Sequence, residues 1–229
     1  MSQFDFEIIH RSLSYLFFEG MRFTLTLTLL SALGGVILGT LLAMARMAGG
    51  PVLAACAAGY VNLVRPLPLV LVIFWFYFLV PYLGQWLTGA SRPIHVGGFA
   101  SALITFIVFE AAYFSEIMRA GIGSIPRGQA AAATALGLTY RQSMRYVILP
   151  QVFRIMLPVL LTQTIVLFQD TSLVYVLSIT DFLGAASKIA QRDGRLVEMY
   201  SFAALVYFIM SFTASQGVRT LRARVAVPR

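Results

Sequence analysis

Uncharged apolar runs long enough to cross a bilayer limit the folds that this chain can adopt. The clearest run, Phe23–Ala45, has no charged residue between Arg22 and Arg46. A helix needs about 20 mostly apolar residues to span the hydrocarbon core. Because 59% of the chain is hydrophobic and only 11% is charged, whereas about a quarter of a soluble domain is charged, the sequence predicts an integral membrane protein.

Five such runs predict an all-α fold with five transmembrane helices. The expected spans are residues 23–45, 66–88, 96–118, 155–179 and 199–218. The second run is long enough to include a turn after Pro81. We expect residues 1–229 to form one transmembrane domain, because five spans leave no room for a second, soluble domain.

Basic residues predict how the chain is oriented. An odd number of spans places the two termini on opposite sides, and cytoplasmic loops carry an excess of Lys and Arg. With the C-terminus inside, eleven of the 17 basic residues face the cytoplasm and six face outward. We therefore expect an N-out, C-in topology, with residues 119–154 forming a cytoplasmic segment.

Several functional classes lack support in the sequence. The arginines stand singly at the edges of apolar runs instead of clustering on a polar face, which argues against nucleic-acid binding. Cys56 is the only cysteine, so no internal disulfide can form. His10 and His95 lack metal-ligand spacing. Acidic residues precede the first run where a signal peptide would be basic, so we expect that run to be retained.

The cytoplasmic segment predicts two short helices joined by a glycine turn. Pro126 suits a first helical turn, and the alanine-rich stretch GQAAAATALG has the composition with the lowest helix cost. Gly137 is well placed to end that helix in a left-handed conformation. Thr139 and Gln142 have the spacing of a capping box for a second helix.

The first of these helices is too short to span a membrane. About eleven residues give roughly 16 Å, and Pro150 is expected to stop or kink the second helix. Two interpretations remain open for the alanine-rich helix: it lies on the bilayer surface, or it docks into a groove on a partner protein. An interfacial helix has a bulky apolar face opposite Lys and Arg, which is missing before Leu136, so docking is favoured.

Three carboxylates within the predicted spans need an explanation, because charge in hydrocarbon is costly. Glu116 has the spacing of an i,i+3 pair with Arg119. Glu110 is expected either in a structural hydrogen-bond network or on the wall of a pathway. The polar cluster Asp170–Ser172 is expected to break or cap the fourth helix. The pair Gly35 and Gly39 permits close helix packing, within the bundle or in a dimer.

The cytoplasmic segment resembles that of the permease subunits of ATP-binding-cassette (ABC) importers. That family carries Glu-Ala-Ala, three residues, Gly, nine residues and Ile-x-Leu-Pro in its cytoplasmic segment. Here Ala131–Ala133, Gly137 and Val147–Pro150 match the spacing. The stretches EAAYFSEIMRAGIGSIPRGQ and LPQVFR resemble the polar amino-acid uptake branch, and LFQDTSLVYVLS and QRDGRLVEM resemble its glutamate/aspartate importers. With TLTLTLL and VRPLPLVLV, the resemblance covers nearly the whole chain.

The resemblance implies a type I importer permease in the bacterial inner membrane that works with several partners. These would be a second permease subunit, identical or different, two cytoplasmic ATP-binding subunits and an extracytoplasmic amino-acid-binding protein. The chain has no Walker A motif, since its single lysine, Lys188, follows Ser187. It is therefore expected not to be an enzyme and to bind no cofactor, with ATP and Mg on the partner ATPase.

The resemblance also implies where the chain is coupled to ATP hydrolysis. The coupling residues would be Arg127, Gly128, Gln129, Ala131, Ala132, Ala133, Leu136, Gly137 and Pro150. Position 131 departs from the family, which has glutamate there, so a charge-assisted contact with the ATPase cannot form at this residue. A second departure is Gln169, where many relatives have lysine.

The substrate pathway is expected to use polar residues of the spans. The candidates are Arg65, Glu110, Tyr113, Asp170, Thr171 and Ser172, with Arg65 either facing substrate carboxylates or anchoring the topology. Glutamine, histidine and arginine remain alternative substrates. An ATP-independent secondary transporter or channel, and a membrane anchor without transport activity, remain alternative functions.

Overall fold

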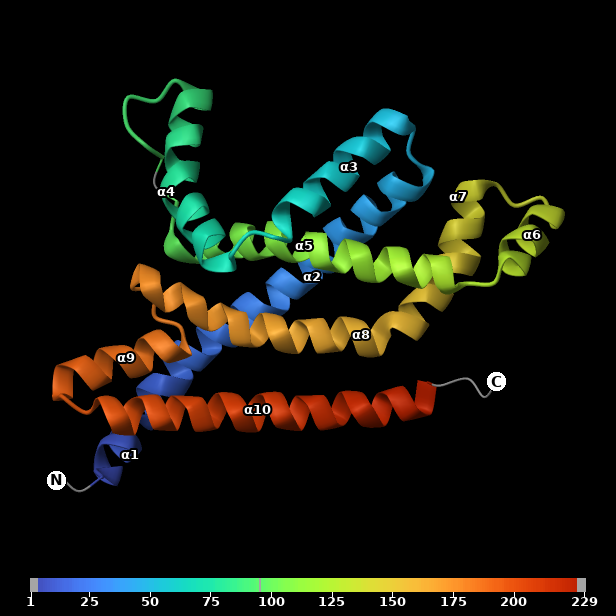
Figure 1. Ribbon diagram of the computed structural model, residues 1–229. Helices are drawn as coiled ribbons and strands as arrows, with labels where there is room; N and C mark the ends of the chain where they lie inside the picture. The colour runs from blue at the N-terminus through green and yellow to red at the C-terminus, as the bar shows by residue number, and fades with distance from the viewer. Residues whose placement is uncertain (1–3, 95, 226–229) are drawn as a thin grey trace. The chain divides into compact units, whose positions relative to one another are not determined.

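The computed structural model describes residues 4–94 and 96–225, and every element within them is helical. Five helical runs among these residues are long and apolar enough to cross a membrane, which confirms the all-α prediction and the number of spans (Figure 1). The runs are Phe6–Ala48, Leu69–Thr88, Gly98–Ser124, Tyr140–Leu177 and Leu196–Ala223.

The first run is longer than the predicted span because helix extends beyond the apolar residues. It comprises α1 (Phe6–Tyr15), a π-helical stretch (Leu16–Met21) and α2 (Arg22–Ala48). Asp5 begins α1, because its carboxylate accepts the backbone N–H groups of Glu7 and Ile8. The next helix, α3 (Pro51–Val64), was not predicted from the sequence. It is too short to span a membrane.

The second span lies within the predicted run. The helix α4 (Leu69–Thr88) begins three residues late, because Pro68 is its N-cap and has extended backbone. The run is long enough for a turn after Pro81, and α4 continues through that residue and ends at Gly89 with φ of 66°. Membrane helices tolerate proline where local adjustments satisfy the freed carbonyl.

The third and fourth spans are α5 (Gly98–Ser124) and a composite helix. The composite helix consists of α7 (Tyr140–Ser143), a π-helical turn (Met144–Ile148), α8 (Leu149–Asp170) and a 3₁₀ segment (Thr171–Leu177). The predicted break at Asp170 is confirmed, because α8 ends there. At Pro150 the sequence predicts a stop or a kink. The stop does not occur, because α8 continues through that residue, and the α-helical pattern changes just before it, in the π-helical turn.

The described residues divide into two compact units. One comprises the described parts of residues 1–33, 67–107 and 164–215. Its core packs the π-helical stretch against α9 (Phe182–Asp193) and α10 (Leu196–Val225) around Phe182 and Met199, which are fully buried. Gly20 permits this approach, because a Cβ there would lie 2.9 Å from the Cα of Phe182.

The second unit comprises the described parts of residues 34–66, 108–163 and 216–229. Here α2 packs closely on α5, since a Cβ at Gly39 would lie 2.7 Å from the Cβ of Phe114. Gly35 faces the same phenylalanine at 3.0 Å. The small-residue pair thus serves packing within the chain. The expectation of a single domain stays a prediction.

Candidate functional site

The alanine-rich helix of the cytoplasmic segment is α6 (Arg127–Ala135), with Pro126 as its N-cap. Gly137 follows it with φ of 78°. The N–H of Gly137 donates to the carbonyl of Thr134 at 2.9 Å, and the N–H of Leu138 donates to that of Ala133 at 3.1 Å. These two bonds form a Schellman motif, which confirms the predicted left-handed C-cap.

The next helix, α7, begins with the predicted capping box. The hydroxyl oxygen of Thr139 accepts the backbone N–H of Gln142, and the Gln142 side chain accepts the backbone N–H of Thr139 at 2.8 Å. The two short helices lie at the turn between α5 and α8, as Figure 1 shows. Local capping therefore defines both ends of this turn.

Most of α6 is presented outward. Ala133 is its one buried residue, at 3% exposure, and Leu136 is 81% exposed. Gln129 accepts a hydrogen bond from Gln151 of α8 at 3.3 Å, which ties the start of α6 to the following span. Five other predicted coupling residues are exposed on α6 or just after it: Arg127, Gly128, Ala131, Ala132 and Gly137. Pro150 is also exposed but lies in α8.

Glu116 joins two helices of the second unit. Its Oε2 accepts from Nε and Nη2 of Arg119 at 3.1 and 2.8 Å, which confirms the predicted pair. Its Oε1 accepts from Nη1 of Arg46 at 2.5 Å. Sequence reasoning missed Arg46 because it lies 70 residues away on α2. Glu116 thus compensates two cations and serves a structural role.

Three pathway candidates also lie in the second unit. Glu110 is fully buried, and its Oε2 accepts a hydrogen bond from the side-chain amide of Gln163 at 3.0 Å. Arg65 caps α3, and its guanidinium lies 5.5 Å from the ring centroid of Tyr113. The Tyr113 hydroxyl donates to the Arg65 carbonyl at 3.1 Å. The structure therefore brings Arg65 and Tyr113 together.

The other three candidates lie in the first unit, at the end of α8. Asp170 is half-buried, and Thr171 is buried with its hydroxyl bonded to the Phe168 carbonyl at 2.7 Å. Ser172 borders a groove of about 440 Å³ against α10. The sequence did not indicate the side chains that line it with Ser172, which are Gln169, Tyr207, Phe208, Ser211, Phe212 and Ser215.

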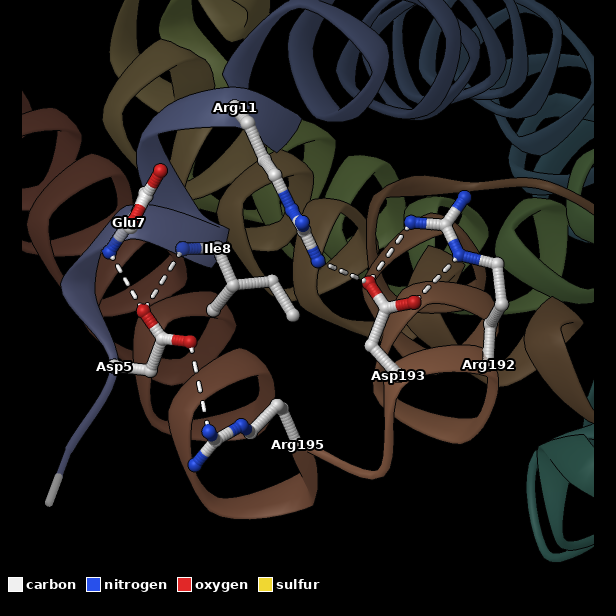
Figure 2. Close-up of polar contacts among 7 residues, drawn as sticks. All are labelled: Asp5, Glu7, Ile8, Arg11, Arg192, Asp193 and Arg195. Carbon is white, nitrogen blue, oxygen red and sulfur yellow. Dashed lines mark hydrogen bonds and ion pairs between the residues drawn. The ribbon is translucent and has the colours of Figure 1, made fainter. Parts of the chain in front are cut away.

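An ion cluster ties α1 to α9 and to the start of α10, as Figure 2 shows. Nη2 of Arg11 donates to Asp193 at 2.9 Å, and Arg192 donates to both oxygens of the same carboxylate at 2.8 and 2.9 Å. Nearby, Arg195 lies 3.6 Å from Asp5 and 3.2 Å from Glu198. The contact between Arg11 and Asp193 joins residues 182 positions apart, so the sequence alone did not indicate that α1 belongs to this cluster.

Two aspartates of this region have altered acidity. The hydrogen bonds from Arg192, aided by Arg11, lower the pKa of Asp193 to about 2. Burial raises the pKa of Asp181 to about 6, although the backbone N–H groups of Gly184 and Leu183 oppose this shift. Asp181 is the N-cap of α9 and is fully buried.

Within residues 4–94 and 96–225, no group of three or more His, Cys, Asp and Glu side chains could hold a metal ion. His95, one of the two histidines considered for such a site, lies outside the described residues. The absence of a metal site and of a cofactor stays a prediction.

The sequence was compared with known families and proteins. Residues 35–227 match the family described as the binding-protein-dependent transport system inner membrane component. The glutamate/aspartate import permease protein GltK of Escherichia coli O6:H1 is 51% identical over 226 residues, which are 99% of this chain and 100% of that protein. The glutamine transport system permease protein GlnP of Escherichia coli K12 is 32% identical over 98% of this chain and 99% of its own length.

Solved structures agree with these relatives. A chain of an amino acid ABC transporter crystallised with histidines has a TM-score of 0.82 and 30% identity, and the match covers 98% of this chain and 100% of that one. A chain of the inward-facing MetNI methionine ABC transporter has a TM-score of 0.72 at 20% identity, covering 99% and 100%. The second likeness shows the fold alone.

Proposed function

Because the chain belongs to the family of binding-protein-dependent transport system inner membrane components, we propose that it is the permease subunit of a bacterial glutamate/aspartate importer. This proposal rests on the 51% identity of the chain to a glutamate/aspartate import permease, over 99% of this chain and 100% of that protein. The chain is a multi-pass protein of the bacterial inner membrane, with an ABC importer permease fold.

ABC importers of this family also have ATPase and binding-protein components. We propose that this chain pairs with a second permease subunit and with two cytoplasmic ATP-binding subunits, and that a binding protein delivers the amino acid from outside. ATP and Mg then bind to the ATPase subunits, and this chain catalyses no hydrolysis. The lack of a Walker A motif supports that division.

We propose that α6 is the helix that docks on the ATPase. Its outward face of small side chains lets a partner surface approach its backbone closely, and the Schellman motif fixes the direction of the chain after it. Ala131 is exposed on α6 and supplies no charge, so docking rests on shape and on the nearby polar groups of Arg127 and Gln129. The N-out, C-in topology predicted from the basic residues supports this role, because it assigns α6 to the cytoplasmic side, where the ATPase subunits bind.

We propose that polar side chains of the spans contribute to the substrate pathway. Arg65 is exposed and offers a guanidinium to a substrate carboxylate. Asp170 and Glu110 offer acceptors to the substrate ammonium, while Tyr113, Thr171 and Ser172 offer hydroxyls. The end of α8 at Asp170 supports this role, because transporter helices are commonly interrupted near their substrates.

Reconstitution tests the proposed function. The purified complex in proteoliposomes, with its binding protein and ATP, is expected to take up labelled glutamate and aspartate in preference to glutamine, histidine and arginine. Vanadate is expected to abolish uptake. Uptake that survives vanadate would identify an ATP-independent transporter, and preference for glutamine, histidine or arginine would overturn the substrate assignment. Failure of any ATPase subunit to co-purify would favour a membrane anchor.

A further inference from the structure

A groove of about 360 Å³ lies between α1 and α9 in the first unit. It is separate from the pathway residues discussed above. The side chains that line it are Arg11, Ser12, Tyr15, Ile189, Arg192 and Asp193. Its volume is within the range of small-molecule sites.

Two arginines of this groove converge on one carboxylate from different helices, as Figure 2 shows. Arg11 comes from α1 and Arg192 from α9, and both bind Asp193. Their side chains are 60% and 67% exposed, whereas that of Asp193 is 18% exposed. A guanidinium has five N–H donors. Within the described residues Arg11 uses one nitrogen and Arg192 two for Asp193, so both retain donors for a ligand.

The charges of the groove are therefore two positive and one negative. Asp193 remains ionised at neutral pH, because its arginine partners lower its pKa to about 2. Tyr15, which is 39% exposed, also lines the groove. A dicarboxylic amino acid has the inverse pattern of two negative charges and one positive charge.

We propose that this groove is an outer receiving site for the dicarboxylic amino acid that the binding protein releases. Each arginine donates to one carboxylate of the ligand, and Asp193 accepts from its ammonium. An amide amino acid such as glutamine has one carboxylate and leaves one guanidinium without an anionic partner, so the site selects acidic amino acids. This inference rests on the proposed function, which supplies the substrate class, and on the N-out, C-in topology that the basic residues predict.

Arg195 provides a matched control for the two groove arginines. It lies in the same ion cluster but not in the lining of the groove, and it is paired with Asp5 and Glu198. Its replacement removes one positive charge from the same region. Charge loss alone can thus be separated from loss of the groove site.

Cysteine protection tests the site where it lies. Tyr15→Cys is introduced with Cys56→Ser into the intact complex in nanodiscs without ATP, and the rate of modification by a charged methanethiosulfonate is measured. L-glutamate is expected to slow that rate at least fivefold, and L-glutamine to leave it within twofold. The protection is expected to be lost with Arg192→Gln or Arg11→Gln and kept with Arg195→Gln. Leu196→Cys, at a residue 52% exposed outside the groove, reports any general effect of glutamate on reactivity.

Each outcome is decisive. Absence of glutamate protection, or protection that survives both groove substitutions, overturns the site while leaving measured glutamate uptake as support for the function. Protection in a complex that does not import glutamate overturns the function and supports the site. Protection by the substrate-free binding protein, with none by glutamate alone, identifies a protein-docking surface and overturns the proposal. The elution profile of each variant on size exclusion checks that the complex is assembled.

Discussion

Gly137 follows α6 with φ of 78°, a conformation that costs a residue with a side chain about 1–2 kcal/mol. Gly137→Val is therefore expected to break the Schellman motif and to lower coupled uptake at least tenfold while ATP hydrolysis persists. Uptake and ATPase rates in proteoliposomes measure this difference. Gly123→Ala is the matched control, since that glycine has open space around it and no positive φ. Normal uptake by Gly137→Val would contradict a role for the turn in coupling.

Ala131 is exposed on α6 and replaces the glutamate that the family motif has at this position. Ala131→Glu restores that residue without a clash inside this chain, so we expect uptake to stay within twofold of the wild-type rate. Co-purification of the ATPase subunit and the uptake rate check this expectation. Loss of the ATPase from the variant complex would show that the docking groove requires a small neutral side chain.

Because of Asp181, the free energy of unfolding is expected to fall as the pH rises. Its pKa in the folded chain is about 6, above its usual value near 3.8, because it is buried. The folded chain holds the Asp181 proton more tightly than the unfolded chain does. The resulting contribution to the free energy of unfolding is complete below about pH 4 and is lost as the pH rises through 6. Two pKa units correspond to about 3 kcal/mol.

Asp181→Asn keeps a side-chain acceptor at the N-cap of α9 but cannot ionise. The stability of the wild-type chain relative to this variant is expected to fall by up to about 3 kcal/mol between pH 4 and pH 7. Unfolding in detergent, followed by fluorescence at several pH values, measures the difference. Parallel pH profiles of the two proteins would refute this account of Asp181.

Among the helices, α2 and α5 of the second unit are held together by packing and by one carboxylate. Gly39 lets the backbones approach, and Glu116 then accepts from Arg46 of α2 and Arg119 of α5. The packing at Gly39 and the contact between Arg46 and Glu116 both join α2 to α5, two helices that are far apart in sequence. Helix pairs of this kind decide how an apolar span is oriented about its own axis.

Glu116→Gln is expected to lower the stability of this helix pair by about 1.5–3 kcal/mol, because hydrogen bonds to charged groups contribute about that much. Arg119→Gln should cost under about 1 kcal/mol, since that side chain is 46% exposed and screened by solvent. Thermal unfolding of the single variants and of Glu116→Gln with Arg46→Gln measures the coupling. Equal losses for Glu116→Gln and Arg119→Gln would show that Arg46 contributes nothing.

For the whole molecule, the distribution of basic residues predicts the orientation in the membrane. With Cys56→Ser as background, Phe6→Cys is expected to react with an impermeant thiol reagent in intact cells. Tyr146→Cys is expected to react only in inverted vesicles. Both side chains are well exposed, at 73% and 64%. The reverse pattern would place the C-terminus outside and remove α6 from the cytoplasm.

The sequence by itself determined the membrane class, the five spans and both short helices of the cytoplasmic segment. These features depend on residues that are close in sequence. Apolar runs predict burial in lipid, and the caps at Gly137 and Thr139 act within a few residues of the helices that they limit. The family followed from motif spacing along the chain. The pair between Glu116 and Arg119 was predictable for the same reason, since one helical turn separates them.

Only the tertiary structure decided which distant residues meet. Arg46 joins Glu116 across 70 residues, and Arg11 joins Asp193 across 182. The groove beside Ser172 likewise depends on α10, which begins 24 residues later. An apolar pattern in a membrane helix does not specify which face meets protein and which meets lipid, because both surroundings are apolar. Contacts between helices, and the sites that they build, are therefore settled by packing in three dimensions.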